Sequence, residues 1–154
     1  MTEELTRIVL QRGDDAAGCY VYGHANPIGM RVRFVRDGEQ GSRAQYVSRI
    51  EHDGWPGVLH GGVTFALMDE AVAYALFFQG IRGVTARVET SFKRPIRTGT
   101  PLLVRAWMLD RKRKLITAKA EVRTDDEQSD LLADMNATMF LLAEDKPSGA
   151  GEND

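Results

Sequence analysis

The segment His60–Phe78 (HGGVTFALMDEAVAYALFF) is the feature that most constrains how this chain can fold. It is rich in Ala, Leu and Met, it has no Lys or Arg, and its only carboxylates are Asp69 and Glu70. Gly80 follows it and predicts a helix C-terminal cap. A helix that is apolar nearly all round is buried on most of its sides. The rest of the chain must therefore supply apolar surface around one long helix.

Segments that predict β-strands lie on both sides of this helix. In the run 84–92, alternation predicts that five side chains share one face: Val84, Ala86, Val88, Thr90 and Phe92. The expected strands are 28–37 and 43–50 before the helix, and 83–93, 101–110, 115–124 and 131–142 after it. This order predicts an α+β fold in which a curved antiparallel sheet wraps around one long central helix.

The length of 154 residues predicts one domain, over residues 1–143. Residues 144–154 are almost without apolar side chains and predict a disordered tail. The lone Cys19 excludes an internal disulfide and suits a reducing compartment. No apolar run is long enough for a membrane-spanning helix, and the N-terminus lacks a signal-peptide core. We therefore expect a cytoplasmic protein that does not associate with membranes.

The formal net charge of −2 conceals a strong charge pattern. Residues 82–123 carry 12 basic and 3 acidic side chains, whereas residues 124–154 carry 1 basic and 9 acidic ones. The basic segment either provides a local field for an anion or is a solvated strand face that the acidic end balances in the fold. Nucleic-acid binding is not expected, because the basic run 111–114 is short and lacks interleaved aromatic residues.

Asp69 and Glu70 need an explanation, because an ionised carboxylate in a buried helix is costly unless it is paired. Adjacent helix positions point about 100° apart, so the two side chains lie in different environments. Either both are satisfied at a rim or by neighbouring arginines, or at least one of them has a function.

Gly61 and Gly62 suggest what that function is. The free N–H groups at a helix N-terminus favour negative charge, and glycine lets a substrate carbonyl approach closely, as in an oxyanion hole. A Gly-Gly pair is also an ordinary turn before a helix. Asp69 lies eight residues beyond Gly61, about 12 Å along a helix. One carbonyl cannot touch both groups on one helix, so a joint site predicts a homodimer.

The stretch W-P-G-V-L-H-G-G-V-T-F-A-L-M-D-E-A, residues 55–71, resembles the signature of hotdog-fold acyl-CoA thioesterases of the phenylacetate-pathway and 4-hydroxybenzoyl-CoA branch. N-P-I-G-M (26–30) and V-T-A-R-V-E-T-S-F-K-R-P-I (84–96) are similar to further segments of that family. The resemblance covers roughly residues 19–142. It implies the hotdog fold and the hydrolysis of an acyl-CoA thioester to a free acid and coenzyme A.

The resemblance also implies roles for individual residues. Asp69, nine positions after the His, would be the nucleophile or general base. The Gly61 N–H would polarise the carbonyl, and His60 would orient the turn or assist. Thr85 matches a threonine near the site in mammalian long-chain acyl-CoA members. The residues that fall where relatives contact coenzyme A are Ser91, Lys93, Arg94, Arg113 and Lys114.

The implied partners are an acyl-CoA substrate and a second copy of the chain, as a dimer or a dimer of dimers. Coenzyme A enters as part of the substrate, and no other cofactor is expected. No metal is expected either, since His24, His52 and His60 are not at zinc-ligand spacings.

Two departures from the family pattern keep an alternative open. Some members have an Asn where this chain has Gly54, and others have a hydroxyl where it has Ala73. They favour a non-catalytic acyl-CoA-binding dimer on the same fold. A hotdog dehydratase would carry a differently placed His and carboxylate pair, which this chain lacks.

Overall fold

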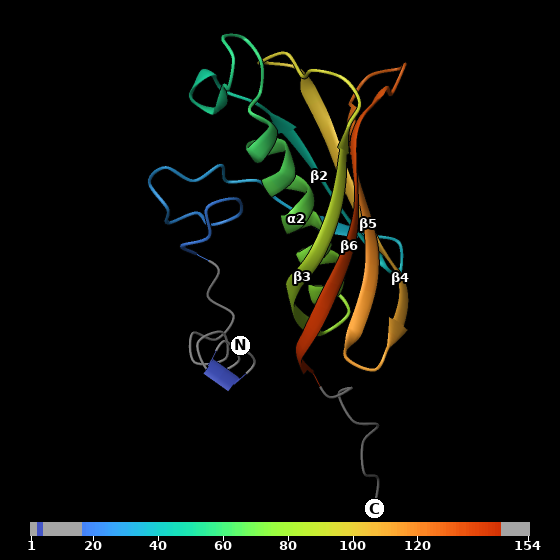
Figure 1. Cartoon of the computed structure of the whole chain (residues 1–154). Coiled ribbons are helices and arrows are strands. Elements are labelled where there is room, and N and C mark those ends of the chain that lie inside the picture. The colour runs from blue at the N-terminus through green and yellow to red at the C-terminus, as the bar shows by residue number, and fades with distance from the viewer. Residues whose placement is uncertain (1–2, 5–16, 146–154) are drawn as a thin grey trace, which may run out of the picture.

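The computed structural model describes residues 3–4 and 17–145 (Figure 1). One long helix packs against a six-stranded antiparallel sheet with strand order β1-β2-β4-β5-β6-β3. The elements are β1 (Val35–Asp37), β2 (Gly41–Val47), the short 3-10 helix η1 (Ile50–His52), α2 (Gly61–Phe77), β3 (Ile81–Phe92), β4 (Pro101–Lys112), β5 (Leu115–Thr124) and β6 (Leu131–Glu144). The predicted α+β class and its hotdog architecture are confirmed.

Helix α2 is buried between the sheet and the segment 17–34, as its apolar composition predicted. On the sheet side, the fully buried Ser42 of β2 donates a hydrogen bond to the backbone oxygen of Ala71 at 2.6 Å. On the other side, the rings of Phe34 and Tyr22 pack on Tyr74, and their centroids lie 5.2 and 4.7 Å, respectively, from the centroid of the Tyr74 ring. A charged side chain on either of these faces would lose its hydration.

Helix α2 and the edge strand β3 run in opposite directions, side by side (Figure 1). Three contacts define their alignment: Gly83 against Leu76, Thr85 hydrogen-bonded to Asp69, and Phe92 against Gly61. The start of the helix therefore lies at the end of β3.

A β-bulge changes which side chains of β3 face the helix. The pairing with β6 shifts between Thr85 and Arg87, which leaves Ala86 as an extra residue. Thr85 pairs with the buried Met139 and so points to the inner face of the sheet. The prediction that Val84 shares one face with Val88, Thr90 and Phe92 is wrong, because the alternation of side chains breaks at the bulge.

The predicted strand 28–37 forms ladder hydrogen bonds only over β1. Arg31 has a φ of +57°, which interrupts an extended strand. The backbone N–H of Val32 instead bonds to the oxygen of Val21, within the segment that covers α2. The alternating burial that suggested a strand is nevertheless present, since Met30, Val32 and Phe34 are buried.

Other boundaries also moved. The predicted strand 43–50 ends at Val47, and the chain then turns through η1. Strand β6 includes Glu144, the first residue of the predicted tail. Residues 146–154 lie outside the described residues, so the disorder of this tail stays a prediction. In the described ranges, no helix is both long and apolar enough to cross a membrane.

Thr90 generates a prediction about stability. It lies on the inner face of β3, in register with the buried Met135, and its Oγ1 is buried without a hydrogen-bond partner in the described part of the chain. We expect Thr90→Val to raise the free energy of unfolding by about 1 kcal/mol, because it removes an unsatisfied polar atom at constant shape. Thermal denaturation measures the change. A destabilised variant would show that the hydroxyl has a partner.

Candidate active site at the start of helix α2

His60 is the N-cap of α2. Its backbone is extended, with φ −61° and ψ 132°, and its Nδ1 accepts a hydrogen bond from the N–H of Gly62 at 2.8 Å. This bond satisfies one of the free N–H groups of the first helical turn. The N–H of Gly62 is therefore occupied, whereas that of Gly61 has no acceptor among the residues described. Of the two glycines, Gly61 offers the free donor.

The loop that leads into this turn is firmly held. The backbone N–H of His60 donates to the oxygen of His52 at 2.9 Å, and that of Leu59 donates to Ile96 at 2.8 Å. The buried His52 is hydrogen-bonded through Nδ1 to the Tyr46 hydroxyl. Burial, and next the charge of Arg49, lower the pKa of His52, so that its neutral form is favoured. The turn is thus held by η1, which is tied to β2 through Tyr46, and by the segment that follows β3.

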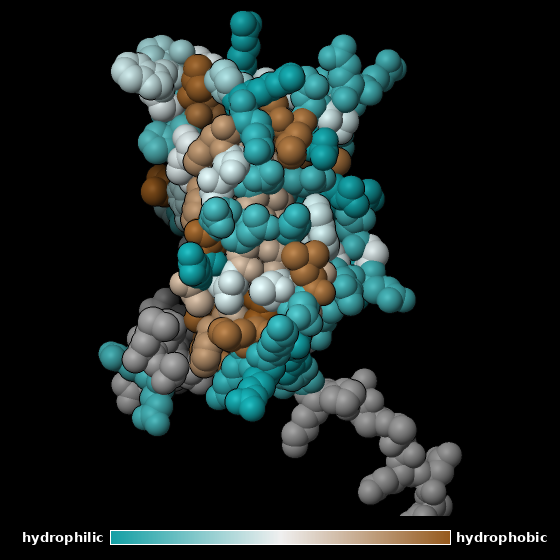
Figure 2. Space-filling view, turned by 45° about the vertical axis from the view of Figure 1, so that its right-hand side comes forward, coloured by the Kyte–Doolittle hydropathy of each residue, from teal (hydrophilic) through white to brown (hydrophobic). Residues whose placement is uncertain are grey.

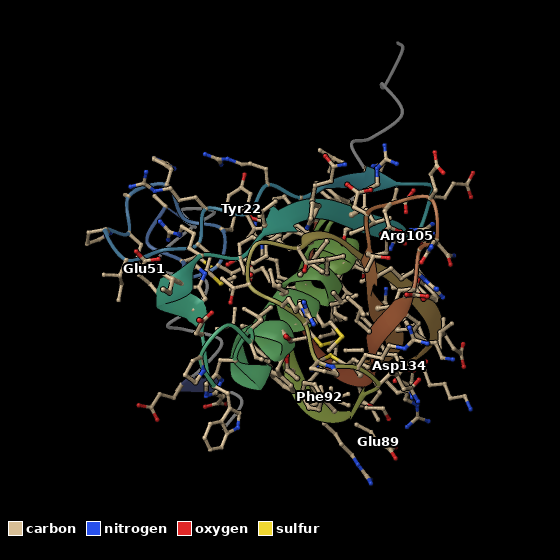
Figure 3. All side chains as sticks on the ribbon, turned by 90° about the horizontal axis from the view of Figure 1, so that it is seen from above. Tyr22, Glu51, Glu89, Phe92, Arg105 and Asp134 are labelled. Carbon is tan, nitrogen blue, oxygen red and sulfur yellow. The ribbon has the colours of Figure 1, made fainter. Side chains whose placement is uncertain are left out.

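A groove of about 320 Å³ opens at the start of α2. Its walls are mainly apolar, with two cationic side chains, and it is lined by Trp55, Val58, Leu59, Gly61, Thr64, Phe92, Lys93, Arg94, Pro95, Ile96, Leu132 and Ala133. Figure 3, seen from this end of the molecule, shows Phe92 on one side of the helix and Tyr22 on the other. An amide donor therefore faces a largely apolar space.

Asp69 lies in the middle of α2, partly buried, and faces the edge strand. Thr85 Oγ1 donates a hydrogen bond to its Oδ1 at 2.7 Å. This bond restricts the carboxylate to one orientation. The structure thus brings together two residues that the sequence singled out on separate elements.

Glu70 lies in a different environment from Asp69, as adjacent helix positions require. Burial raises the pKa of Glu70; a hydrogen bond from the Cys19 thiol lowers it, and the charge of Asp69 raises it further. Glu70 is therefore associated with the segment that covers the helix, while Asp69 faces β3. Only Asp69 lies toward an open sheet edge.

Asp69 and Gly61 do not meet within one protomer. Helix α2 is unbroken from Gly61 to Phe77, so the eight-residue step from Gly61 to Asp69 spans about 12 Å. The separation predicted from the sequence is retained.

Lys93 and Arg94 lie beside the groove. Their side chains are 48% and 62% exposed and form ion pairs with Asp134 and Asp130, at 3.9 and 3.1 Å. Ser91 is also exposed, but it points to the outer face of the sheet, since it alternates with Phe92.

Arg113 and Lys114 lie at the other end of the same protomer. They form the turn between β4 and β5, and Lys114 Nζ lies 5.9 Å from the ring of Phe140. Figure 1 places this turn near the start of β3, whereas Lys93 follows the end of that strand. One protomer does not bring the two basic pairs together.

The acidic end of the chain balances part of the basic segment. Four ion pairs join residues 82–123 to residues 124–145: Arg82–Asp145, Lys93–Asp134, Arg94–Asp130 and Arg111–Glu144. Three of them join residues of β3, or of the segment that follows it, to residues in or next to β6, and the fourth reaches β6 from β4 across β5. Because exposed ion pairs contribute little to stability, these cations remain able to exchange partners. Within the described ranges, no three His, Cys, Asp or Glu side chains are grouped to hold a metal ion.

Thr64 and Phe92 line the groove but were not among the candidate site residues from the sequence. Thr64 follows Gly61 by three residues, a spacing that puts both on one helix face and is readable from the sequence. Phe92 reaches the groove through the docking of β3 on α2, which no local pattern encodes.

Residues 56–130 match the family model of the thioesterase superfamily. Among solved structures, a thioesterase superfamily protein aligns with a TM-score of 0.72 and 25% identity; the match covers 78% of this chain and 61% of that one. A mutant of the phenylacetic acid degradation protein PaaI of Thermus thermophilus aligns with a TM-score of 0.64 and 25% identity, and the match covers 71% of this chain and 91% of that one. A Streptococcus mutans protein bound to acetyl-CoA shares the fold, with a TM-score of 0.68 and 18% identity, and the match covers 75% of this chain and 91% of that one. No curated protein matches in sequence.

The cap generates a second prediction. We expect His60→Ala to lower the free energy of unfolding by about 1 kcal/mol, because the Gly62 N–H loses its acceptor. His60→Asn is the control, since asparagine is a favourable N-cap, and it should restore most of the loss. Equal thermal stability of the wild type and the alanine variant would contradict the capping role.

Proposed function

We propose that this chain, a hotdog-fold member of the thioesterase superfamily, hydrolyses an acyl thioester of coenzyme A to the free acid and coenzyme A. The observation that carries the proposal is the pairing of an oriented carboxylate, Asp69 held by Thr85, with a free amide donor, Gly61 N–H, on the same helix. A base and an oxyanion donor are the two groups that thioester hydrolysis requires. The acetyl-CoA bound to a relative of the same fold supports the substrate class.

In the proposed reaction, the Asp69 carboxylate removes a proton from water as the water oxygen bonds to the thioester carbon. Negative charge develops on the carbonyl oxygen, opposite the Gly61 N–H. The carbon–sulfur bond then breaks, and the proton passes from Asp69 to the coenzyme A thiolate. In the competing route, an Asp69 oxygen attacks the carbon and the carbon–sulfur bond breaks, so that coenzyme A leaves as a thiolate and an anhydride remains on Asp69. Water then hydrolyses the anhydride, and the proton that the water loses passes to the thiolate. Thr85 orients the carboxylate in either route.

The site is proposed to form between two protomers. Strand β3 is a 12-residue edge strand. Within one protomer, Gly61 of α2 lies beside Phe92 of β3, and Asp69 of α2 lies beside Thr85 of β3. If two copies of β3 pair antiparallel about a two-fold axis at residue 89, Phe92 of one lies opposite Thr85 of the other, because the bulge leaves Ala86 out of the pairing. Gly61 of one protomer then approaches Asp69 of its partner.

The surface is compatible with such an association. Figure 2 shows a band of hydrophobic residues along the forward face, crossed by hydrophilic ones. Phe92, next to the groove, is 57% exposed in the single chain. Large exposed apolar side chains are typical of interfaces. An antiparallel two-fold would also bring the partner's Arg113 and Lys114 toward the end that holds Lys93 and Arg94. Cations from both protomers would then bind the phosphates of coenzyme A.

A non-catalytic acyl-CoA-binding dimer is the second candidate. A Cβ placed on Gly54 would lie 3.3 Å from the Cα of His60, so the turn is closely packed where some relatives carry an asparagine. The chain therefore lacks one polar side chain near the carbonyl site. This candidate predicts saturable binding of acyl-CoA without turnover.

The role of Asp69 can be tested with Asp69→Asn. We expect kcat to fall by about 10²-fold, because the amide is neither a base nor a nucleophile. The measurement is thiol release from a panel of short, long and aromatic acyl-CoA esters. Glu70→Gln is the matched control, since Glu70 lies on a different side of the helix, and it should retain activity. Activity of Asp69→Asn within about tenfold of wild type would refute the assignment.

The two-protomer site can be tested by complementation. Gly61→Pro removes the free N–H at the first position of the helix, where proline is tolerated. His60 already has the backbone that a residue before proline adopts. Gly61→Ala is the control, because it keeps the N–H and its Cβ would lie 3.6 Å from Phe92, an ordinary contact.

We expect Gly61→Pro and Asp69→Asn each to be inactive, and their co-expressed mixture to recover about a quarter of wild-type activity. Half of the dimers would then be mixed, and each mixed dimer would contain one intact site. No recovery in dimers shown by mass spectrometry to be mixed would mean that both groups act from one protomer.

A further inference from the structure

Thr64 is a buried polar residue whose hydroxyl has no hydrogen-bond partner in the described part of the chain. It is only 2% exposed, and it lines the groove at the start of α2. Unlike the Oγ1 of Thr90, the Oγ1 of Thr64 is not fully enclosed by protein atoms. The hydroxyl therefore reaches the space of the groove, where a ligand can accept its hydrogen bond.

The usual partner of such a hydroxyl within the helix is already bonded to other groups. A threonine hydroxyl inside a helix commonly donates to the carbonyl four residues earlier, which here is that of His60. That oxygen instead accepts the backbone N–H groups of Val63 at 2.9 Å and Thr64 at 3.1 Å. The Thr64 hydroxyl remains available to the groove.

The position of Thr64 in the helix aims it at the first turn. Residues three apart lie on the same helix face, and helical side chains lean toward the N-terminus. The side chain of Thr64 thus extends toward the turn that begins with Gly61. The two donors, an amide and a hydroxyl, face the same groove.

The proposed oxyanion hole lacks a second donor. The Gly62 N–H is bonded to His60, and Gly54 has no side chain to contribute. We propose that the Thr64 hydroxyl is the second oxyanion donor, which makes Thr64 a catalytic residue for the proposed thioester hydrolysis on which this inference rests. It donates a hydrogen bond to the carbonyl oxygen as charge develops there. It transfers no proton, so the bonds formed and broken are those of the proposed reaction.

The surroundings of Thr64 strengthen this role. Ile96, Leu132 and Ala133, which line the same groove, are almost completely buried and exclude water. A hydrogen bond to a charged oxygen is worth more in such a low-dielectric site than in water. Both oxyanion donors would then come from one protomer, and the carboxylate from the other.

The test compares three variants in acyl-CoA hydrolysis. Thr64→Val removes the hydroxyl at nearly constant shape, and we expect kcat to fall about 10²-fold with KM within a few fold of wild type. Thr64→Ser keeps a hydroxyl and should restore most of the loss. Thr90→Val is the matched control, because it removes an unpaired hydroxyl that lies outside the groove, and its kcat should equal that of wild type. Circular dichroism checks that all three fold.

The outcomes are separable. The inference is overturned if Thr64→Val keeps wild-type kcat, if it changes only KM, or if Thr64→Ser loses as much as Thr64→Val. Each of those results leaves the proposed function intact as long as Asp69→Asn is inactive. A wild-type protein that hydrolyses no acyl-CoA ester would overturn both.

Discussion

The burial of helix α2 is the constraint on which the rest of the structure depends. The helix has apolar side chains on nearly every face, and it becomes stable only when the sheet covers one side and the segment 17–34 covers the other. Because both sides of the helix are packed, its position and length are fixed. It holds Gly61 and Asp69 about 12 Å apart and leaves only its start and its β3-facing side for chemistry.

The β-bulge in β3 decides what Asp69 contacts. If Ala86 were instead paired in a regular ladder, the inner face of the strand would continue through Ala86 and Val84, and Thr85 would point outward. The shift turns Thr85 inward, where its hydroxyl orients the carboxylate. A local irregularity thereby converts an otherwise ordinary edge strand into part of the candidate site.

The charge pattern also has a structural basis. Most of the described acidic end of the chain forms β6, which lies within the sheet next to β3 and one strand away from β4, so acids and bases meet along the sheet. The acidic end balances part of the basic segment, while Lys93 and Arg94 stay exposed beside the groove. The two interpretations of the basic segment are therefore compatible. A cation engaged with a surface carboxylate can exchange it for a phosphate.

The sequence by itself determined the long buried helix, the antiparallel strands around it, and the positions of Asp69 and the H-G-G turn, because these follow from local periodicity and spacing. It also determined the separation of Gly61 from Asp69, since the rise of a helix is constant. The tertiary structure alone decided that His60 binds the Gly62 N–H and that Thr85 faces Asp69. It alone also decided that Thr64 is left without a partner among the residues described, and that the two basic pairs lie at opposite ends of one protomer. These features depend on a bulge, a cap and the docking of a strand on a helix. Such contacts join residues far apart in the chain, and no local pattern records them.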